Sequence, residues 1–295
     1  MRALGWLTAV VLLASCGCAS EPGPAQGPGS SPAPAAGSSP AGSASARATA
    51  TGAAARCGGP AGPSRLVTIR TSDGARLAGF EAGAGSRGVV LVPEAGSAGS
   101  CGWWPYATYL AQRGFRVLAF DHRCQGNSTC PTGSAGGQDA GLLTDIAAAV
   151  LALRGAGAGR VALLGASQGG SEALIAAGGR ASGTGAVAEV AGVAALSADE
   201  LDQPLAPPPG PRTAVTAAAA VRVPALLAVA PDDPYVSLTG TRSLFAALGT
   251  PAARKRLLVQ PAGAGHGWVM VDGTPGEPEP PLAAQLAAFL RTVTT

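Results

Sequence analysis

Ser167 is the residue whose surroundings most clearly suggest chemistry, because it stands at the centre of a Gly-x-Ser-x-Gly pentapeptide, residues 165–169. The apolar run before it, residues 161–164, predicts a strand, and the alanine-rich run after it, residues 170–177, predicts a helix. A strand, this tight turn and a helix make a nucleophile elbow, which holds a serine hydroxyl out at the N-terminus of a helix. Since 44 of the 295 residues are glycine, the pentapeptide alone is a weak signal, and its interpretation depends on partners elsewhere in the chain.

A serine hydroxyl is a weak nucleophile at neutral pH and needs a neighbouring base, which in turn needs an acid to orient it. The chain has two histidines, and His266 follows the apolar run 256–260 in a glycine-rich loop, C-terminal to the serine. Between the two, the apolar run 224–230 predicts a buried strand that leads into Asp232 and Asp233. The order serine, aspartate, histidine therefore predicts a catalytic triad of the serine, His266 and one of these aspartates.

From Leu66 to its end, the chain resembles the α/β-hydrolase superfamily. Besides the elbow, the acid and the histidine, residues 117–128 carry an Asp, an Arg, a Gly and a Ser at the spacing of the family's strand-4 exit. This resemblance places His122 on a structural turn and leaves the other histidine as the triad base. In the family the acid usually stands three residues before a Val or Leu. Asp233 meets that spacing, so we expect it to be the acid and keep Asp232 as the alternative.

The resemblance implies the α/β-hydrolase fold, with a mostly parallel eight-stranded sheet and helices on both faces. The alternation of apolar runs with helical stretches also predicts this α/β class. We expect strands at residues 65–69, 76–81, 88–92, 116–120, 160–164, 191–196, 224–230 and 256–260. We expect helices at residues 104–113, 139–154, 168–178, 213–221, 239–248 and 281–292. The segment after the sixth strand, residues 197–212, is short and proline-rich, so we expect a minimal cap over the site.

The loop after the third strand departs from the family pattern. Many relatives carry His-Gly where this chain has Pro93-Glu94. The family's oxyanion hole is built from backbone N–H groups, and the alignment makes Ala95 and Gln168 the two donors. Pro93 has no N–H and cannot donate. A carboxylate of Glu94 inside the hole would oppose a negative charge, so this side chain either points away or weakens the hole.

Aromatic side chains are scarce in this chain, at 4% of residues, yet several fall near the predicted oxyanion and histidine loops. We expect Trp103 and Trp268 to line a substrate pocket together with Glu94. Trp104 and Tyr106 are nearly as well explained by packing in the core. Nothing in the sequence indicates a cofactor.

The N-terminus predicts export. A basic start is followed by an apolar segment, residues 3–13, which is too short to span a bilayer as a mature helix. Residues 13–16, Leu-Ala-Ser-Cys, resemble the bacterial lipobox, in which the cysteine is lipidated and becomes the new N-terminus. The resemblance implies a signal peptide over residues 1–15 and a lipid anchor on Cys16 that holds the protein at the outer face of the cell membrane. The alternative is an ordinary signal peptide cut near Ala19, which would give a secreted protein.

The chain then divides into two parts. Residues 16–56 are mostly alanine, glycine, serine and proline with almost no charge, and such a segment cannot bury enough apolar area to fold, so we expect a disordered tether. Residues 57–295 have the size of one domain with a substantial core. This division predicts a hydrolase domain held away from the lipid surface.

The cysteine content and the net charge limit which bonds and partners are expected. The exported domain would contain Cys57, Cys101, Cys124 and Cys130, an even number that suggests disulfides in an oxidising compartment. Cys124 and Cys130 bracket one loop and are expected to pair, which leaves Cys57 for Cys101. With two histidines and no Cys-x-x-Cys, we expect no metal site. The net charge of +3 without a basic cluster does not indicate a nucleic-acid partner, and we expect a monomer.

The function predicted from these residues is that of an exported, lipid-anchored serine hydrolase acting through an acyl-enzyme. Small or medium carboxylic esters are the expected substrates. One alternative is a peptidase, amidase or thioesterase on the same fold. The other is a surface lipoprotein that retains the fold for binding without catalysis.

Overall fold

The computed structural model describes residues 52–59, 63–131, 141–179, 189–198, 214–272 and 278–295. The chain divides into two units at Ala41, and all described residues belong to the second unit, Gly42–Thr295. Cys16, the lipobox and the predicted tether up to residue 51 therefore lie outside the described residues, as do residues 199–213, where the minimal cap is expected.

The described residues form one eight-stranded sheet in the order β1-β2-β4-β3-β5-β6-β7-β8. The first pairings, β1 with β2 and β2 with β4, are antiparallel, and all later pairings are parallel. The strands are β1 Ser64–Arg70, β2 Arg76–Ala82, β3 Arg87–Val92, β4 Phe115–Phe120, β5 Arg160–Ala166, β6 Val193–Leu196, β7 Ala225–Val229 and β8 Lys255–Val259. The predicted α/β class and mostly parallel eight-stranded sheet are confirmed.

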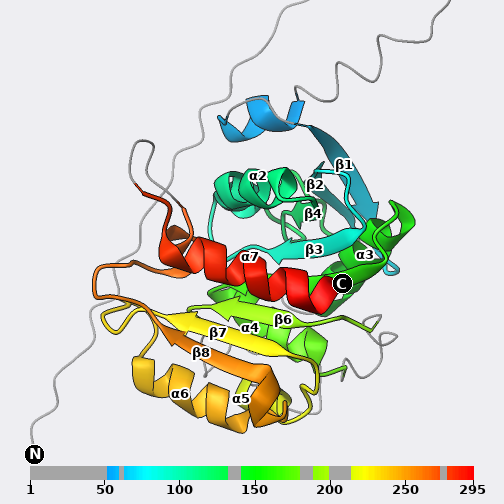
Figure 1. The fold of residues 1–295 in the computed structure, drawn as a ribbon. Coiled ribbons are helices and arrows are strands. Elements are labelled where there is room, and N and C mark those ends of the chain that lie inside the picture. The colour runs from blue at the N-terminus through cyan, green and yellow to red at the C-terminus, as the bar shows by residue number, and fades with distance from the viewer. Residues whose placement is uncertain (1–51, 60–62, 132–140, 180–188, 199–213, 273–277) are drawn as a thin grey trace, which may run out of the picture. The chain divides into compact units, whose positions relative to one another are not determined.

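Helices cover both faces of the sheet, and two hydrophobic clusters fill the spaces between. The α-helices are α2 Trp104–Gln112, α3 Leu142–Gly155, α4 Gln168–Ala177, α5 Ala214–Ala218, α6 Leu238–Ala247 and α7 Pro281–Thr294. Helices α2 and α7 pack on one face, where Figure 1 shows α7 lying across the sheet, and α3 to α6 pack on the other. Alternate residues of β3 enter opposite clusters: Val89 and Leu91 face α2 and α7, whereas Val90 and Val92 face the other helices. Burial on both faces explains why these strands are continuous apolar runs.

The strand order reverses direction at β3. From β3 the chain passes to β4 on one side, and the next crossover brings β5 to its other side. In open α/β sheets a crevice forms outside the carboxyl ends of the strands at such a switch point, and ligands bind there. The residues after β3 and β5, which include Glu94 and Ser167, lie at this point of the sheet.

The folded part begins earlier than the sequence predicts. Residues 52–57 are helical, and Ala53 and Ala54 are buried in the cluster shared with α2 and α7. Arg56 pairs with the buried carboxylate of Asp121. The expected boundary at residue 57 is therefore wrong by at least five residues, since this short segment is ordered by contacts from distant parts of the chain.

Both expected disulfides are present. Cys57 is bonded to Cys101, with 5.1 Å between the two Cα atoms, and Cys124 to Cys130, with 4.5 Å. Both separations fall in the usual range for a disulfide. The first ties the short N-terminal helix to the segment before α2, and the second closes the loop after β4.

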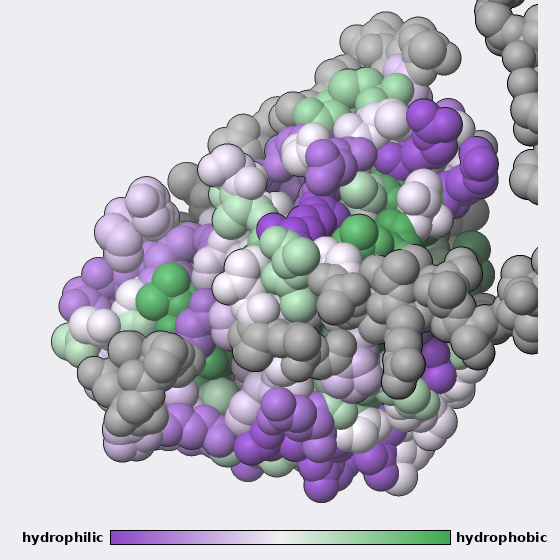
Figure 2. Space-filling view, turned by 90° about the horizontal axis from the view of Figure 1, so that it is seen from above, coloured by the Kyte–Doolittle hydropathy of each residue, from purple (hydrophilic) through white to green (hydrophobic). Residues whose placement is uncertain are grey.

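The surface drawn in Figure 2 is mostly hydrophilic, with small groups of hydrophobic residues between polar ones among the coloured atoms. Within the described ranges, no helix is long and apolar enough to cross a membrane.

Candidate active site

Ser167 sits in a strained turn between β5 and α4. Its backbone has φ 50° and ψ −123°, a conformation that is rare for residues other than glycine. The flanking glycines make the turn possible: a Cβ on Gly165 would lie 1.9 Å from the carbonyl oxygen of Gly169, and a Cβ on Gly169 would lie 2.3 Å from that of Pro93. The close approach of β5, α4 and the β3 exit thus requires the Gly-x-Ser-x-Gly pattern. The turn puts Ser167 at the N-cap of α4, where the helix dipole favours negative charge.

His266 and Asp233 meet at the carboxyl ends of the last two strands. Nδ1 of His266 lies 2.8 Å from Oδ1 and 3.0 Å from Oδ2 of Asp233. Asp232 instead accepts hydrogen bonds from the Gly263 N–H, at 2.9 and 3.0 Å. The structure therefore brings Asp233, the residue preferred from the sequence, to the histidine. An aspartate at Nδ1 holds the proton on that nitrogen and leaves Nε2 as the base.

The carboxylate of Asp233 is held by several donors in addition to the imidazole. It accepts hydrogen bonds from the backbone N–H groups of Tyr235 and Val236, at 3.0 and 3.1 Å, and from the hydroxyl of Ser197, at 2.6 Å. Burial alone would raise the pKa of Asp233, but the hydrogen bonds from Ser197, the Tyr235 N–H and His266 outweigh it and lower this pKa below its ordinary value. Asp233 is thus prepared to stay ionised beside the histidine.

Ser197 is a site residue that the sequence reasoning missed. It follows β6 directly, is completely buried, and has φ 49°. Its hydroxyl donates to Asp233 and accepts from the backbone N–H of Gly267, at 3.0 Å, so it joins the acid to the residue after the histidine. The available signal was a serine at the carboxyl end of a strand that neighbours the acid's strand. A second missed residue is Tyr235, whose exposed ring meets the His266 ring edge-on at 4.7 Å between centroids.

Glu94 turns toward the histidine loop. One carboxylate oxygen lies 3.5 Å from Nε2 of His266, and both side chains are 12% exposed. Burial raises the pKa of Glu94 to about 7, a hydrogen bond from the Trp268 N–H opposes that rise, and the charges of Asp233 and Asp272 add to it. Within the described residues the Ser167 hydroxyl has no hydrogen bond to His266, so in this structure the polar side chain within ion-pairing distance of Nε2 is Glu94.

Comparisons with known proteins support the fold. The family model described as alpha/beta hydrolase fold matches residues 88–222, which include the β3 exit and the elbow. Among solved structures, an esterase from Pyrococcus furiosus is similar, with 18% identity, a TM-score of 0.60, and coverage of 79% of this chain and 91% of that chain. DcsB, solved in complex with its substrate analogue, has 15% identity, a TM-score of 0.62, and coverage of 79% and 99%. A monoacylglycerol lipase from Paleococcus ferrophilus has 19% identity, a TM-score of 0.54, and coverage of 73% and 98%. No curated protein sequence matches significantly.

The chain has the α/β-hydrolase fold. At these identities the similarity of structures speaks for the fold alone, so the chemistry of this α/β-hydrolase domain has to be argued from its own residues.

The predicted oxyanion donors follow two neighbouring strands, β3 and β5. Ala95 follows β3 in an exposed loop, and Gln168 is the first residue of α4. The first N–H groups of a helix have no partner within the helix, so the N–H of Gln168 is available to an anion. The side chain of Gln168 is held away by a hydrogen bond to Glu172, at 2.7 Å.

Of the two tryptophans expected to line a pocket, one lies in the core and the other is partly exposed. Trp103 is completely buried, and its indole N–H donates to the Val92 carbonyl oxygen at 3.0 Å, so its expected place in a pocket wall is wrong. Its ring meets that of Trp268, which is partly exposed beside His266, so Trp103 supports the histidine loop from the core. Trp104 and Tyr106 are core residues too. The Trp104 ring meets the Phe80 ring of β2 edge-on, and the Tyr106 hydroxyl donates to the Ala283 carbonyl oxygen of α7 at 3.0 Å.

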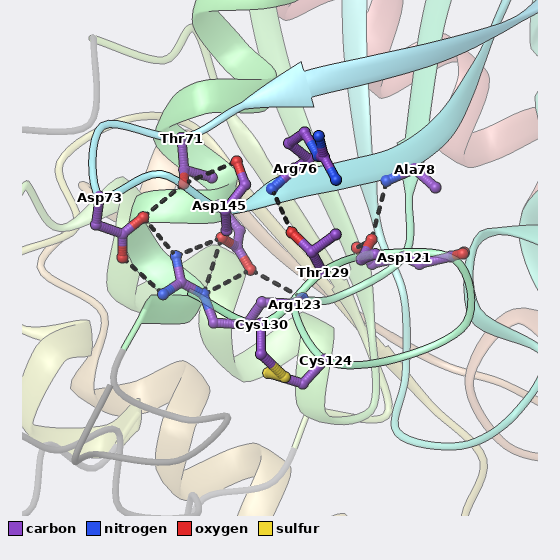
Figure 3. A network of polar contacts seen from close by, with 12 residues as sticks. Thr71, Asp73, Arg76, Ala78, Asp121, Arg123, Cys124, Thr129, Cys130 and Asp145 are labelled. Carbon is purple, nitrogen blue, oxygen red and sulfur yellow. Dashed lines mark hydrogen bonds and ion pairs between the residues drawn. A yellow bond between two sulfur atoms is a disulfide. The ribbon is translucent and has the colours of Figure 1, made fainter. Parts of the chain in front are cut away.

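The loop after β4 is held by a network of polar contacts, which Figure 3 shows. The Arg123 guanidinium lies between the carboxylates of Asp145 and Asp73, both at 2.7 Å from its nitrogens. Asp121 accepts hydrogen bonds from the N–H and the hydroxyl of Ser100, at 2.9 and 2.7 Å. Next to it, His122 is buried and its Nε2 lies 3.1 Å from the Pro93 carbonyl oxygen; burial lowers its pKa to about 4. This histidine thus packs behind the β3 exit as a structural residue, in agreement with the expectation.

Within the described residues, no group of three or more His, Cys, Asp or Glu side chains is arranged to hold a metal ion.

Proposed function

We propose that the protein is a serine hydrolase that acts through an acyl-enzyme on carboxylic esters with small or medium acyl groups. The observation that carries this proposal is the Asp233–His266 pair, 2.8 Å apart, at the same end of the sheet as a serine in a strained elbow. A buried acid that fixes an imidazole serves general-base chemistry, and a strained serine at a helix N-terminus serves nucleophilic attack.

In the proposed mechanism, Asp233 accepts the Nδ1–H of His266 and leaves the Nε2 lone pair to take the proton of the Ser167 hydroxyl. The serine oxygen attacks the carbonyl carbon, and the N–H groups of Ala95 and Gln168 bind the resulting oxyanion. Each such donor contributes about 10²–10³ in kcat in a well-studied protease. His266 then gives its proton to the departing alcohol. Water, activated by the same histidine, hydrolyses the acyl-enzyme and restores the serine.

An ester is the favoured substrate class because the similar solved structures include an esterase, an esterase domain and a monoacylglycerol lipase. Amides and thioesters on the same fold are the alternatives. The test compares purified protein on matched p-nitrophenyl esters of two, four and eight carbons, the corresponding p-nitroanilides, and an acyl thioester, with Ser167→Ala as control. We expect ester hydrolysis that disappears in the variant. Faster turnover of the anilides or the thioester would contradict the ester assignment, and no turnover at all would favour a binding role.

We further propose that the protein is exported and held by a lipid on Cys16. Support comes from the lipobox sequence and from two disulfides in the folded domain, which are typical of oxidising compartments. Replacing Cys16 with Ala is expected to move the protein from the membrane fraction to the soluble fraction, or to block its processing. Unchanged membrane attachment of the Cys16→Ala variant would contradict the anchor.

A further inference from the structure

Glu94 stands where a catalytic histidine needs free space. Its Oε2 atom lies 3.5 Å from Nε2 of His266, the nitrogen that has to accept the serine proton. The contact is built into the fold, since the carboxylate rests against the backbone of the histidine loop: a Cβ on Gly267 would lie 2.8 Å from the same oxygen, and the Trp268 N–H donates to the carboxylate.

One proton shared between the Glu94 carboxylate and Nε2 of His266 gives the most favourable contact between these two groups. With Nδ1 of His266 bonded to Asp233, Nε2 is either a bare lone pair or the second N–H of an imidazolium. A bare lone pair and a carboxylate repel each other, whereas one proton between them gives either a neutral O–H···N contact or an ion pair.

We propose that Glu94 and Nε2 of His266 hold one proton between them in the free protein, and that loss of this proton to solvent frees the histidine to act as the base for Ser167. This inference rests on the proposed function. Glu94 acts through Nε2 of His266, so it is a residue that sets the protonation of the base. When the proton leaves, Nε2 regains its lone pair and Glu94 becomes a carboxylate, which stabilises the imidazolium formed during attack.

The surroundings of Glu94 favour a proton held at neutral pH. The facing titratable groups are His266 itself and two carboxylates, Asp233 and Asp272. Asp272 is partly buried, one of its oxygens is buried without a hydrogen bond in the described part of the chain, and burial raises its pKa to about 6. Together with burial, these acidic neighbours raise the pKa of Glu94 to about 7. Loss of the shared proton is therefore expected in the physiological pH range.

The test is the pH dependence of Ser167 labelling by a fluorophosphonate probe, in wild type and in Glu94→Gln. The amide keeps the size of the side chain and an acceptor for the Trp268 N–H but cannot hold the proton. We expect the acid limb of the wild-type rate to fall near pH 7, and that of Glu94→Gln to fall at least about one pH unit lower. At pH 5.5 the variant would then label about tenfold faster than wild type, and at pH 8.5 within about threefold of it.

Two variants act as controls. Glu189→Gln makes the same change at an exposed residue just before β6, at the opposite end of that strand from Ser197, and is expected to keep the wild-type profile. Glu94→Ala gives a second removal of the carboxyl group should the amide variant fail to fold.

The possible outcomes separate the explanations. An equal loss of rate at every pH in Glu94→Gln would overturn the inference in favour of a structural role. A large gain at pH 8.5 would overturn it too, because the carboxylate would then be opposing the oxyanion. If wild type is labelled but the acid limb of Glu94→Gln lies at the same pH as that of wild type, this inference is contradicted and the proposed function is not. Folded protein that is not labelled at any pH contradicts the proposed function, and the inference with it.

Discussion

Ser197 offers the most informative single substitution outside the triad. Its hydroxyl donates to Asp233 at 2.6 Å and accepts from the Gly267 N–H at 3.0 Å, and the side chain is completely buried. Ser197→Ala removes the donor and leaves a backbone N–H next to His266 without its partner. The change therefore affects the acid and the histidine loop together, while the nucleophile is untouched.

The magnitude follows from these two contacts. A hydrogen bond to an ionised group contributes about 1.5–3 kcal/mol, and a buried donor left without a partner costs about 1–3 kcal/mol. Since both losses concern one hydroxyl and partly overlap, we expect Ser197→Ala to lower the free energy of unfolding by about 3 kcal/mol at pH 7. Looser positioning of the imidazole is expected to slow labelling of Ser167 by about tenfold, which corresponds to about 1.4 kcal/mol in the barrier.

The loss of stability depends on pH in a defined direction. The hydrogen bond from Ser197 helps to lower the pKa of Asp233 in the folded protein. A lowered pKa contributes stability that is present above the unfolded value, about 3.9, and is lost as pH falls through the folded value. The difference between wild type and Ser197→Ala is therefore expected to be largest near neutral pH and to shrink below about pH 4.

The assay is urea unfolding at several pH values, combined with the rate of fluorophosphonate labelling. Ser128→Ala is the matched control, because that hydroxyl also accepts one backbone N–H, from Ala78 at 2.9 Å, and donates once, to the Asp121 carbonyl oxygen at 2.8 Å. The control is expected to lose stability without any change in labelling. Wild-type stability and wild-type labelling in Ser197→Ala would refute the argument that this hydroxyl joins the acid to the histidine loop.

Two further substitutions test the choice of the acid and the burial of Asp145. Asp233→Asn is expected to lower kcat by about 10³–10⁴ because an amide no longer stabilises the imidazolium. Asp232→Asn is expected to change kcat by less than about threefold. Comparable losses of kcat in the two variants, measured by steady-state kinetics, would reopen the choice of acid. Arg123→Ala leaves the carboxylate of Asp145 buried without the guanidinium that pairs with it. This change is expected to lower the free energy of unfolding, measured by urea titration, by about 3–5 kcal/mol. A loss below about 1 kcal/mol would show that water reaches Asp145.

The fold could be predicted because its signals are local. The strand and helix around Ser167 follow from an apolar run, two glycines and an alanine-rich segment, and the structure places β5 and α4 there. The ends of the strands differ more: the apolar run predicts a strand from residue 191, whereas β6 begins at Val193, although the Ala191 N–H already bonds to the Val161 carbonyl oxygen. Ends of short strands depend on pairing with neighbours, which an isolated segment does not reveal.

The features that escaped prediction depend on contacts between distant segments. The helix over residues 52–57 has the composition of the preceding tether, and its place in the fold comes from the Cys57–Cys101 disulfide and from Arg56. The direction of the Glu94 side chain is set by the histidine loop, 172 residues further along at His266. The role of Ser197 depends on two loops that follow other strands. None of these contacts leaves a pattern in the local sequence.

The central claim is that Ser167 is a nucleophile activated by His266. The most direct measurement is mass spectrometry of the intact protein after reaction with a fluorophosphonate at pH 8.5, in wild type, Ser167→Ala, His266→Ala and His122→Ala. We expect a single adduct on Ser167 in wild type and in a folded His122→Ala, no adduct in Ser167→Ala, and a strongly slowed reaction in His266→Ala. An adduct on another residue, or labelling that survives in His266→Ala but disappears in a folded His122→Ala, would contradict this claim.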